Sequence, residues 1–277
     1  MRLWVYPNDY LHLDRWFNHL WDELAAVILI LEKKMRKFKV FYLLTLSILV
    51  SGCIFPVRYT RVLGSGEVVT ETRRVSGFSV VELSGIGTLI IEQGRKESLE
   101  ITAEDNVLRY LQSNVNGKNL RLSVDDFVSI EPTKEIIYHL TVKNLERIEI
   151  SGLGNIEIKA LETSELDFEI SGSGNAYIEN LQADSLNLQI SGLGNMEIGG
   201  SVENQRIELS GAGNYNAEDL KSSKARIDIS GTGKAAMWVE NEFDVELSGM
   251  GNLQYYGSPI LSTEISGIGT VKSLGDK

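Results

Sequence analysis

The stretch RIEISGLGNIEI at residues 147–158 contains the pattern that decides the fold of this chain. Apolar and polar residues alternate on both sides of a Ser-Gly-x-Gly-Asn motif, as in two strands that each bury one face. We interpret the motif as a corner whose glycines adopt positive φ angles, which residues with a Cβ atom resist. Asparagine suits the corner because its amide can bond to nearby backbone and can stack on equivalent asparagines above and below. The first three regular corners are expected to be built by Gly152, Gly154, Asn155, Gly172, Gly174, Asn175, Gly192, Gly194 and Asn195.

The motif recurs with a nearly constant period. Ser-Gly-x-Gly begins at Ser84, Ser151, Ser171, Ser191, Ser210, Ser230, Ser248 and Ser266. From Ser151 onward the spacings are 20, 20, 19, 20, 18 and 18 residues. One coil of this length cannot bury its own apolar face, whereas coils stacked about 4.8 Å apart pair their strands and share a core. The sequence therefore predicts an all-β parallel β-helix, or β-solenoid. An antiparallel β-sandwich with glycine hairpins is the main alternative.

Two further segments, together with the repeats, carry a resemblance to a known family. Residues 77–85 read GFSVVELSG, and Leu140-Thr141-Val142 is followed by LERIEISG at residues 145–152. These segments and the serial Ser-Gly-x-Gly-Asn motifs look like the putative auto-transporter adhesin, head GIN domain family, which is common among Bacteroidetes lipoproteins. The resemblance covers about residues 68–275. It implies a β-helical domain with an adhesion function, and it brings no catalytic residues.

Residues 95–145 interrupt the repeat. The sequence predicts strands over residues 99–103 and 120–124 and a turn over residues 116–119. It also predicts a short helix over residues 105–112, capped by Asp105 or Asn106. We expect this segment to pack on the first coil as an elaboration of the same domain.

A different pattern lies upstream of the repeats. Residues 35–39 are mostly basic and residues 40–50 are apolar, as in a secretory signal peptide. The apolar run is too short for a normal membrane span, which needs about 20 residues. Val50-Ser51-Gly52-Cys53 resembles a bacterial lipobox. The resemblance implies diacylglycerol on the Cys53 thiol, cleavage before Cys53, and acylation of the new amino group. Several acyl chains on one residue give stable membrane anchoring.

These patterns divide the chain into four parts. Residues 1–34 are expected to be an extension upstream of the true translation start, with a membrane-associated segment as the alternative. Residues 35–53 are the predicted signal peptide and lipobox, residues 54–67 a tether, and residues 68–277 the β-solenoid. The residues after Cys53 include no acidic run, which favours the periplasmic face of an outer membrane over the cell surface.

Composition excludes several classes of site and partner. Cys53 is the single cysteine, so an intrachain disulfide or a thiolate metal site cannot form. Residues 53–277 carry 20 Lys and Arg against 33 Asp and Glu, a formal charge of −13. Such a surface repels nucleic acid phosphates and anionic lipid head groups, which argues against both as partners.

An acidic row is the first candidate site. The residue two positions before each motif serine is expected to point outward, and most of these residues are acidic: Glu149, Glu169, Glu208, Asp228, Glu246 and Glu264. Carboxylates suit hard cations, so the row is a candidate for Ca²⁺ or for a cationic partner. The alternative is a solvated negative stripe. The aspartate-bearing glycine repeats of calcium β-rolls are absent.

Aromatic residues near the C-terminal coils are the second candidate. Tyr215, Trp238, Tyr255 and Tyr256 belong to this group, and Trp238 and Tyr256 occupy the same repeat position. Exposed rings at Trp238 and Tyr256 would stack on sugar rings. The alternative is that they cover the apolar end of the solenoid.

The residues do not favour catalysis. The acids recur as a ladder, whereas an active site needs one unrepeated cluster with perturbed pKa values. Nucleophile elbows, Walker loops and metal-ligand spacings are absent. The sequence predicts a lipid-anchored binding or adhesion protein of the cell envelope, without catalytic activity or a required cofactor, whose ligand is a glycan or a protein. A structural envelope lipoprotein and a carbohydrate-active β-helix enzyme are the alternatives.

Overall fold

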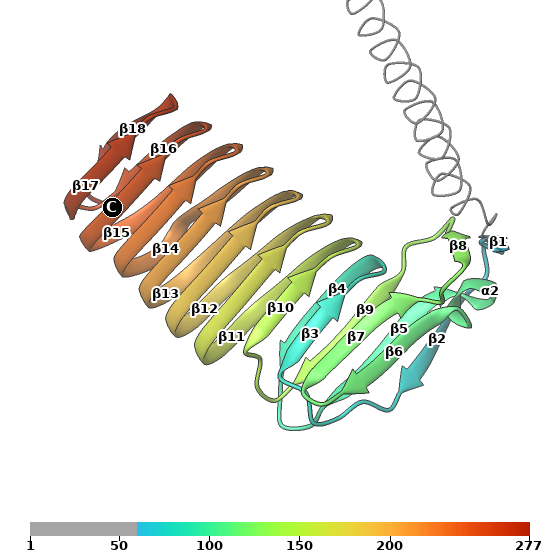
Figure 1. Ribbon diagram of the computed structural model, residues 1–277. Coiled ribbons are helices and arrows are strands. Elements are labelled where there is room, and N and C mark those ends of the chain that lie inside the picture. The colour runs from blue at the N-terminus through green and yellow to red at the C-terminus, as the bar shows by residue number, and fades with distance from the viewer. Residues whose placement is uncertain (1–59) are drawn as a thin grey trace, which may run out of the picture. The chain divides into compact units, whose positions relative to one another are not determined.

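The computed structural model describes residues 60–277, which form a parallel β-solenoid of about six turns with coils about 20 residues apart (Figure 1). The predicted fold class is confirmed. The predicted extension, signal peptide and Cys53 lie outside the described residues. Within residues 60–277, no helix is long and apolar enough to cross a membrane.

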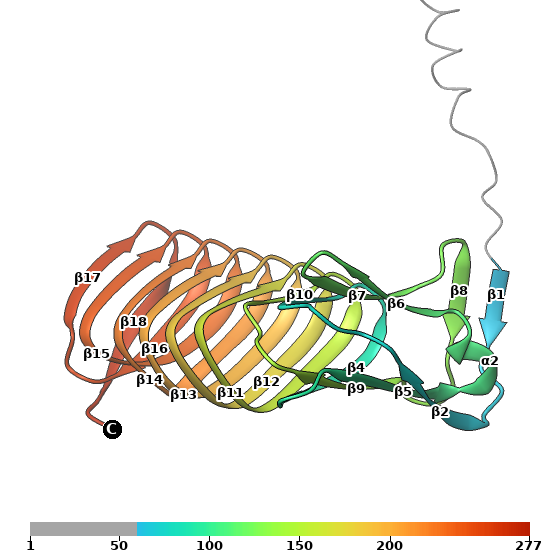
Figure 2. The same cartoon turned by 90° about the horizontal axis from the view of Figure 1, so that it is seen from below.

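The regular coils consist of long strands that follow one another around the solenoid (Figure 2). The full-length coils are β11 (Leu153–Ile170), β12 (Ser173–Ile190), β13 (Leu193–Leu209), β14 (Ala212–Ile229) and β15 (Thr232–Leu247). The shorter strands at the C-terminal end are β16 (Met250–Tyr256), β17 (Ile260–Ile265) and β18 (Ile268–Gly275). Each strand pairs in parallel with its equivalent in the next coil, so identical repeat positions form rows along the solenoid.

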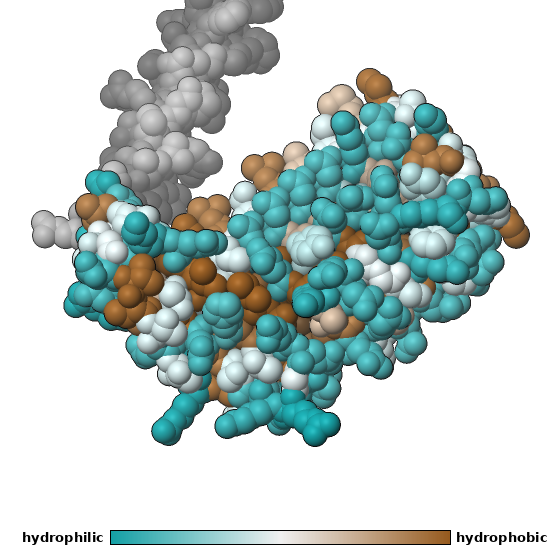
Figure 3. Space-filling view, turned by 180° about the vertical axis from the view of Figure 1, so that it is seen from behind, coloured by the Kyte–Doolittle hydropathy of each residue, from teal (hydrophilic) through white to brown (hydrophobic). Residues whose placement is uncertain are grey.

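Alternation along each strand separates the core from the surface. Ile150, Ile170 and Ile190 stack in one buried row, and Phe168 and Leu188 are neighbours in another. The residues between them point outward. On the face drawn in Figure 3, hydrophilic side chains predominate and apolar side chains form smaller patches between them. The continuous core explains why a coil that is unstable alone is stable in a stack.

Glycine is needed at the corners because neighbouring coils pack closely there. The prediction that the corner glycines adopt positive φ angles is wrong. Among the motif glycines of residues 60–277, Gly87 alone has a positive φ, of 130°. The chain bends at Ser-Gly, and the remaining x-Gly-Asn already belongs to the next strand. A Cβ atom on Gly172 would lie 2.2 Å from the carbonyl oxygen of Gly152, and one on Gly174 would lie 1.8 Å from that of Gly154. Stacked coils therefore approach too closely for any side chain at these positions.

The N-terminal part combines the first coil with non-repeating strands. Its elements are β1 (Thr60–Leu63), β2 (Val68–Arg73), β3 (Val80–Leu83), β4 (Ile86–Gln93), β5 (Ser98–Glu104), α2 (Asp105–Leu108), β6 (Leu111–Asn116), β7 (Asn119–Val124), β8 (Val128–Glu131), β9 (Ile137–Val142) and β10 (Arg147–Ile150). Strands β3 and β4 pair with β10 and β11, and on their other edges with β7 and β9. Strands β7 and β9 of the segment 95–145 therefore cover the N-terminal edge of the first coil. Strand β1, within the predicted tether, pairs with β8.

The helix predicted over residues 105–112 is wrong beyond Leu108. Helix α2 has four residues, and Leu111 begins strand β6. The predicted cap is also wrong, because Glu104 occupies the N-cap position and makes no side-chain capping bond. Leu111 is fully buried opposite Val124 of β7, so pairing within the sheet overrides the local helical spacing.

Candidate binding groove

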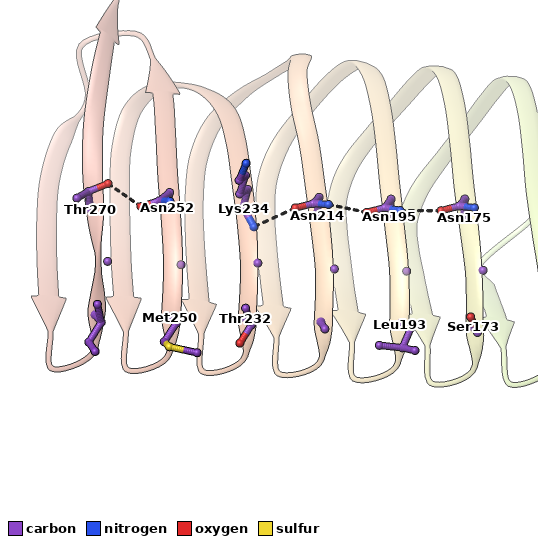
Figure 4. A pocket seen from close by; sticks show the side chains of 18 residues that line it. Ser173, Asn175, Leu193, Asn195, Asn214, Thr232, Lys234, Met250, Asn252 and Thr270 are labelled. Carbon is purple, nitrogen blue, oxygen red and sulfur yellow. Dashed lines mark hydrogen bonds between the residues drawn. The ribbon is translucent and has the colours of Figure 1, made fainter.

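A shallow groove runs along one side of the solenoid, crossing six coils. We call it the axial groove. It has a volume of about 860 Å³ and is lined by Ser173, Gly174, Asn175, Leu193, Gly194, Asn195, Ala212, Gly213, Asn214, Thr232, Gly233, Lys234, Met250, Gly251, Asn252, Ile268, Gly269 and Thr270. Figure 4 shows its two walls: the residues at position x of the motif on one side and the asparagine positions on the other.

The motif itself creates this groove. Position x and the asparagine are two residues apart in one strand, so both side chains point outward, about 6.6 Å apart along the strand. The glycine between them faces the interior, as shown by the isoleucine methyl carbons of Ile170 and Ile190 that approach Gly194 and Gly213. Since each strand stacks in register on the next, the two outward positions become two continuous walls.

The wall formed by the x positions is unusually apolar for an exposed surface. Leu193 is 61% exposed, Met250 56% and Ile268 77%. Smaller side chains occupy the other three positions of this wall, at Ser173, Ala212 and Thr232. Aliphatic groups that no part of the solenoid covers offer an apolar surface to a ligand.

The opposite wall is a hydrogen-bonded ladder of amides. The Nδ2 atom of Asn195 donates to Oδ1 of Asn175 at 2.9 Å, and Nδ2 of Asn214 donates to Oδ1 of Asn195 at 2.7 Å (Figure 4). Nδ2 of Asn175 donates in the same direction, to Oδ1 of Asn155 at 3.2 Å. The stacking predicted from the sequence is confirmed. An amide that donates one bond and accepts one bond in the ladder keeps a second N–H and an oxygen lone pair for a ligand.

Lys234 interrupts the ladder between Asn214 and Asn252 (Figure 4). The backbone N–H of Lys234 donates to Oδ1 of Asn214 at 3.2 Å. The ladder resumes one coil later, where Thr270 Oγ1 donates to Oδ1 of Asn252 at 2.9 Å. Lys234 is the one charged residue among those that line the groove.

The acidic row lies on another wall of the solenoid, with its members in register. Glu149 pairs with Glu169, Glu208 with Asp228, and Glu246 with Glu264. Arginines from the adjacent row neutralise part of it: Arg147 lies 2.7 Å from Glu169, Arg206 3.1 Å from Glu208, and Arg226 3.3 Å from Glu246.

The surroundings of Glu149 disfavour its ionised form. Partial burial raises the pKa of Glu149, and the neighbouring carboxylates of Glu82 and Glu169 raise it further. Within residues 60–277, no group of three or more His, Cys, Asp or Glu residues is arranged to hold a metal ion. The row is therefore a line of carboxylates interleaved with guanidinium groups.

The aromatic candidates separate into two groups. Tyr215 is buried and its hydroxyl donates to Gln205 Oε1 at 2.8 Å, so this ring belongs to the core. It follows the outward asparagine by one residue and therefore points inward. Tyr255 packs its ring edge-on against Phe243, with 5.6 Å between centroids.

Trp238 and Tyr256 are register neighbours and are half-buried. The Lys277 ammonium lies 5.5 Å from the Trp238 ring centroid and 5.4 Å from that of Tyr256. Lys277 is held there by Asp219 Oδ1 at 2.6 Å and by the Glu218 carbonyl oxygen at 2.7 Å. A sugar that stacks on either ring would have to share this surface with Lys277.

Sequence reasoning missed the axial groove, although signals for it were present. Leucine, methionine and isoleucine at position x are large apolar residues in a motif otherwise made of small and polar ones. Lys234 is the residue where the asparagine pattern is replaced by a charge. Neither signal indicates a groove until the register of the coils is known.

Comparisons with known proteins agree with this architecture. The family model described as Putative auto-transporter adhesin, head GIN domain matches residues 77–259. The chain is similar to the crystal structure of a putative adhesin from Bacteroides fragilis, with 27% identity, a TM-score of 0.74, and coverage of 77% of this chain and 100% of that chain. A comparison with curated proteins found no match.

Two more distant structures share the fold alone. One is a putative adhesin from Parabacteroides merdae, with 20% identity, a TM-score of 0.64, and coverage of 77% of this chain and 99% of that one. The other is a putative lipid binding protein from Parabacteroides distasonis, with 21% identity, a TM-score of 0.66, and coverage of 78% and 100%. Because the family model matches more than half of the chain, the protein belongs to the family described as Putative auto-transporter adhesin, head GIN domain.

Proposed function

We propose that this protein is a lipid-anchored, non-catalytic adhesion protein of the cell envelope that binds an extended glycan along the axial groove. The observation that carries the proposal is a groove over six successive coils that has exposed aliphatic side chains on one wall and asparagine amides on the other. The aliphatic residues are Leu193, Met250 and Ile268, and the amides are those of Asn175, Asn195, Asn214 and Asn252. A sugar chain has both kinds of complementary surface, since its C–H faces suit aliphatic groups and its hydroxyls suit amides. Membership of an adhesin family supports the same reading.

The length and periodicity of the groove favour a polymer. Six coils at about 4.8 Å give a groove about 24 Å long in which the same pair of walls repeats. An extended peptide repeats its side chains every two residues, about 6.6 Å, which is out of step with the coils. A small molecule would contact two or three coils and leave the others unused.

The residues that line the groove support binding without catalysis. They include no Asp, Glu, His or Cys, and their hydroxyls are those of Ser173, Thr232 and Thr270. Glycoside hydrolysis requires paired carboxylates, and most other hydrolytic mechanisms require a general base near the reacting bond. Trp238 and Tyr256 would provide a second contact for a sugar once Lys277 moves away from their rings.

The anchor is proposed from Cys53 and its lipobox. Acylation there would hold the protein at a membrane, with the periplasmic face of the outer membrane as the expected location. Replacing Cys53 with serine should abolish incorporation of a labelled fatty acid and release the protein from the membrane fraction. A Cys53→Ser variant that still carries the label would contradict this assignment.

Binding is tested with the full chain in detergent, against immobilised glycans and matrix proteins. We expect saturable binding to at least one polysaccharide, and no change in the size of that polysaccharide after prolonged incubation. Shortening of the polysaccharide would instead indicate a carbohydrate-active enzyme. Absence of binding to every glycan would contradict the proposed function and favour a structural envelope protein.

A further inference from the structure

The charge inside the axial groove has the opposite sign to that of the protein. The whole chain has a formal charge of −11, yet the residues that line the groove include one cation, Lys234, and no carboxylate. Lys234 makes no ion pair within residues 60–277. A bound ligand therefore meets, on the fourth of the six coils, a lysine whose ammonium group makes no ion pair within the described residues.

The direction of the amide ladder adds a second unpaired donor at the same place. Each asparagine donates Nδ2 to the oxygen of the preceding coil, as Asn214 does to Asn195. The coil before Asn252 carries Lys234, whose side chain has no acceptor. Asn252 Nδ2 accordingly donates to no described residue, while its Oδ1 is occupied by Thr270. At this gap in the ladder, therefore, the Lys234 ammonium and the Asn252 amide N–H groups are donors without a partner among residues 60–277.

The row beside the asparagine ladder changes character along the solenoid. Its N-terminal members include Glu157 and Glu197, and its C-terminal members are Gln254 and Lys272. Lys272 and Lys234 line a common hollow in which Glu218 is the one acid. The electrostatic surroundings of the gap are therefore more favourable to an anion than those of the first coils.

We infer that the gap at Lys234 binds an anionic group, a carboxylate or a sulfate, carried by an acidic polysaccharide that lies in the axial groove. Either group offers several acceptor oxygens, which suit the Lys234 ammonium and the Asn252 amide together. This inference rests on the proposed function, because the groove must first hold a polysaccharide. Lys234 is then the residue that selects acidic chains over neutral ones.

The chain offers a well-matched variant for the test. Lys234→Asn introduces the residue found at Asn214 and Asn252, so it should restore the ladder and leave the melting temperature equal or higher. Lys159→Asn is the control: it removes the same charge from an exposed lysine outside the groove. Both variants change the net charge equally, so a difference between them reports the local site.

The experiment measures binding of the full chain to polygalacturonate, dextran sulfate and neutral dextran of similar length. We expect wild type and Lys159→Asn to bind an acidic polymer more tightly than dextran, and Lys234→Asn to lose about threefold to tenfold of that affinity. Preference for polygalacturonate identifies a carboxylate ligand, and preference for dextran sulfate identifies a sulfate.

Failure of the inference is distinct from failure of the proposed function. Equal affinity of wild type and Lys234→Asn for every acidic polymer overturns the role of Lys234. Binding of neutral dextran as tight as that of both acidic polymers also overturns it, while leaving the groove as a glycan site. Absence of binding to all three polymers by a folded protein removes the inference and weakens the proposed function itself.

Discussion

At the residue scale, the requirement for glycine at the corners comes from the nearby backbone of the neighbouring coil and not from the φ angles of the glycines themselves. Gly174 shows this most clearly, because the carbonyl oxygen of Gly154 would lie 1.8 Å from any added Cβ atom. The interior of a stacked solenoid is as tightly packed as other protein cores, so an extra carbon must displace backbone. The same reasoning applies to Gly213, Gly233 and Gly269, where the carbonyl oxygen of the preceding coil would lie 2.0–2.1 Å from an added Cβ atom.

The Gly174→Ala variant should therefore be strongly destabilised. Overpacking typically lowers the free energy of unfolding by about 1–3 kcal/mol, and a backbone clash places this variant at the upper end. Gly85→Ala is the control, since its added Cβ atom would lie 3.5 Å from the nearest atoms, at Ser123. Chemical denaturation measures both, and equal stability of the two variants would contradict the packing argument.

A buried polar pair makes a second residue-scale prediction. Gln205 accepts the Tyr215 hydroxyl at 2.8 Å, but the Gln205 Nε2 atom is buried and has no partner within the described chain. Tyr215→Phe alone should lower the free energy of unfolding by about 1–2 kcal/mol, because it also leaves Gln205 Oε1 unpaired.

The double variant Gln205→Leu with Tyr215→Phe should recover that loss. It removes both polar groups together, and leucine is the residue of the neighbouring coil at this position, Leu186. Thermal unfolding of the wild type, the single variant and the double variant measures the effect. A double variant less stable than Tyr215→Phe alone would contradict this expectation. It would show that Gln205 stabilises the fold despite its unpaired Nε2 atom.

At the element scale, the parallel register turns each outward position into a row, and rows of like charge oppose one another. Glu149 faces Glu82 on one side and Glu169 on the other. Glu169 is paired with Arg147, whereas Glu149 makes no ion pair within residues 60–277. Burial, followed by the two neighbouring carboxylates, raises the pKa of Glu149.

Replacing Glu149 with glutamine should raise the free energy of unfolding at neutral pH, by about 0.5 kcal/mol. A carboxyl whose pKa is raised in the folded state destabilises that state above the raised pKa. This effect shrinks as the pH falls through the raised pKa, and it is absent below the ordinary pKa of the group. The advantage of Glu149→Gln should therefore vanish on acidification.

Glu169→Gln provides the matched control for this prediction. It removes the same charge from the neighbouring position in the row, but it breaks the contact with Arg147. We expect it to be neutral or slightly destabilising at neutral pH. Denaturant unfolding over a range of pH compares the two variants, and identical effects would rule out the row as the cause.

At the scale of the whole molecule, the near-constant repeat period led to the correct prediction of a solenoid from the sequence. The spacing from Ser151 onward and the period-2 alternation favour stacked coils over a β-sandwich, and stacked coils place Asn175 and Asn195 in one ladder. What could not be predicted depends on contacts between coils. Contacts between residues distant in sequence determine three features that were not predicted. These are the ordinary φ angles of the corner glycines, the end of the helix at Leu108 and the exposed wall that contains Leu193.

The candidate sites were predictable to different degrees for the same reason. The acidic row follows from alternation alone, and its register with Glu149 and Glu169 is as expected. The burial of Tyr215 also follows from alternation, once the adjacent asparagine is recognised as outward-facing. The groove could be recognised only in the assembled stack, because it is formed by positions that lie about 20 residues apart in the chain.

We propose the axial groove as the adhesive surface of the protein, and substitution of its exposed aliphatic residues is the sharpest test. We would measure the affinity of the full chain for its best-binding polysaccharide with Leu193→Asp and Met250→Asp, and with Leu63→Asp as a control. Leu63 is as exposed as Leu193, at 64% and 61%, but it lies on β1 away from the groove. We expect at least tenfold weaker binding for the two groove variants, with unchanged melting temperatures and an unaffected control. Wild-type affinity in both groove variants would contradict this proposal.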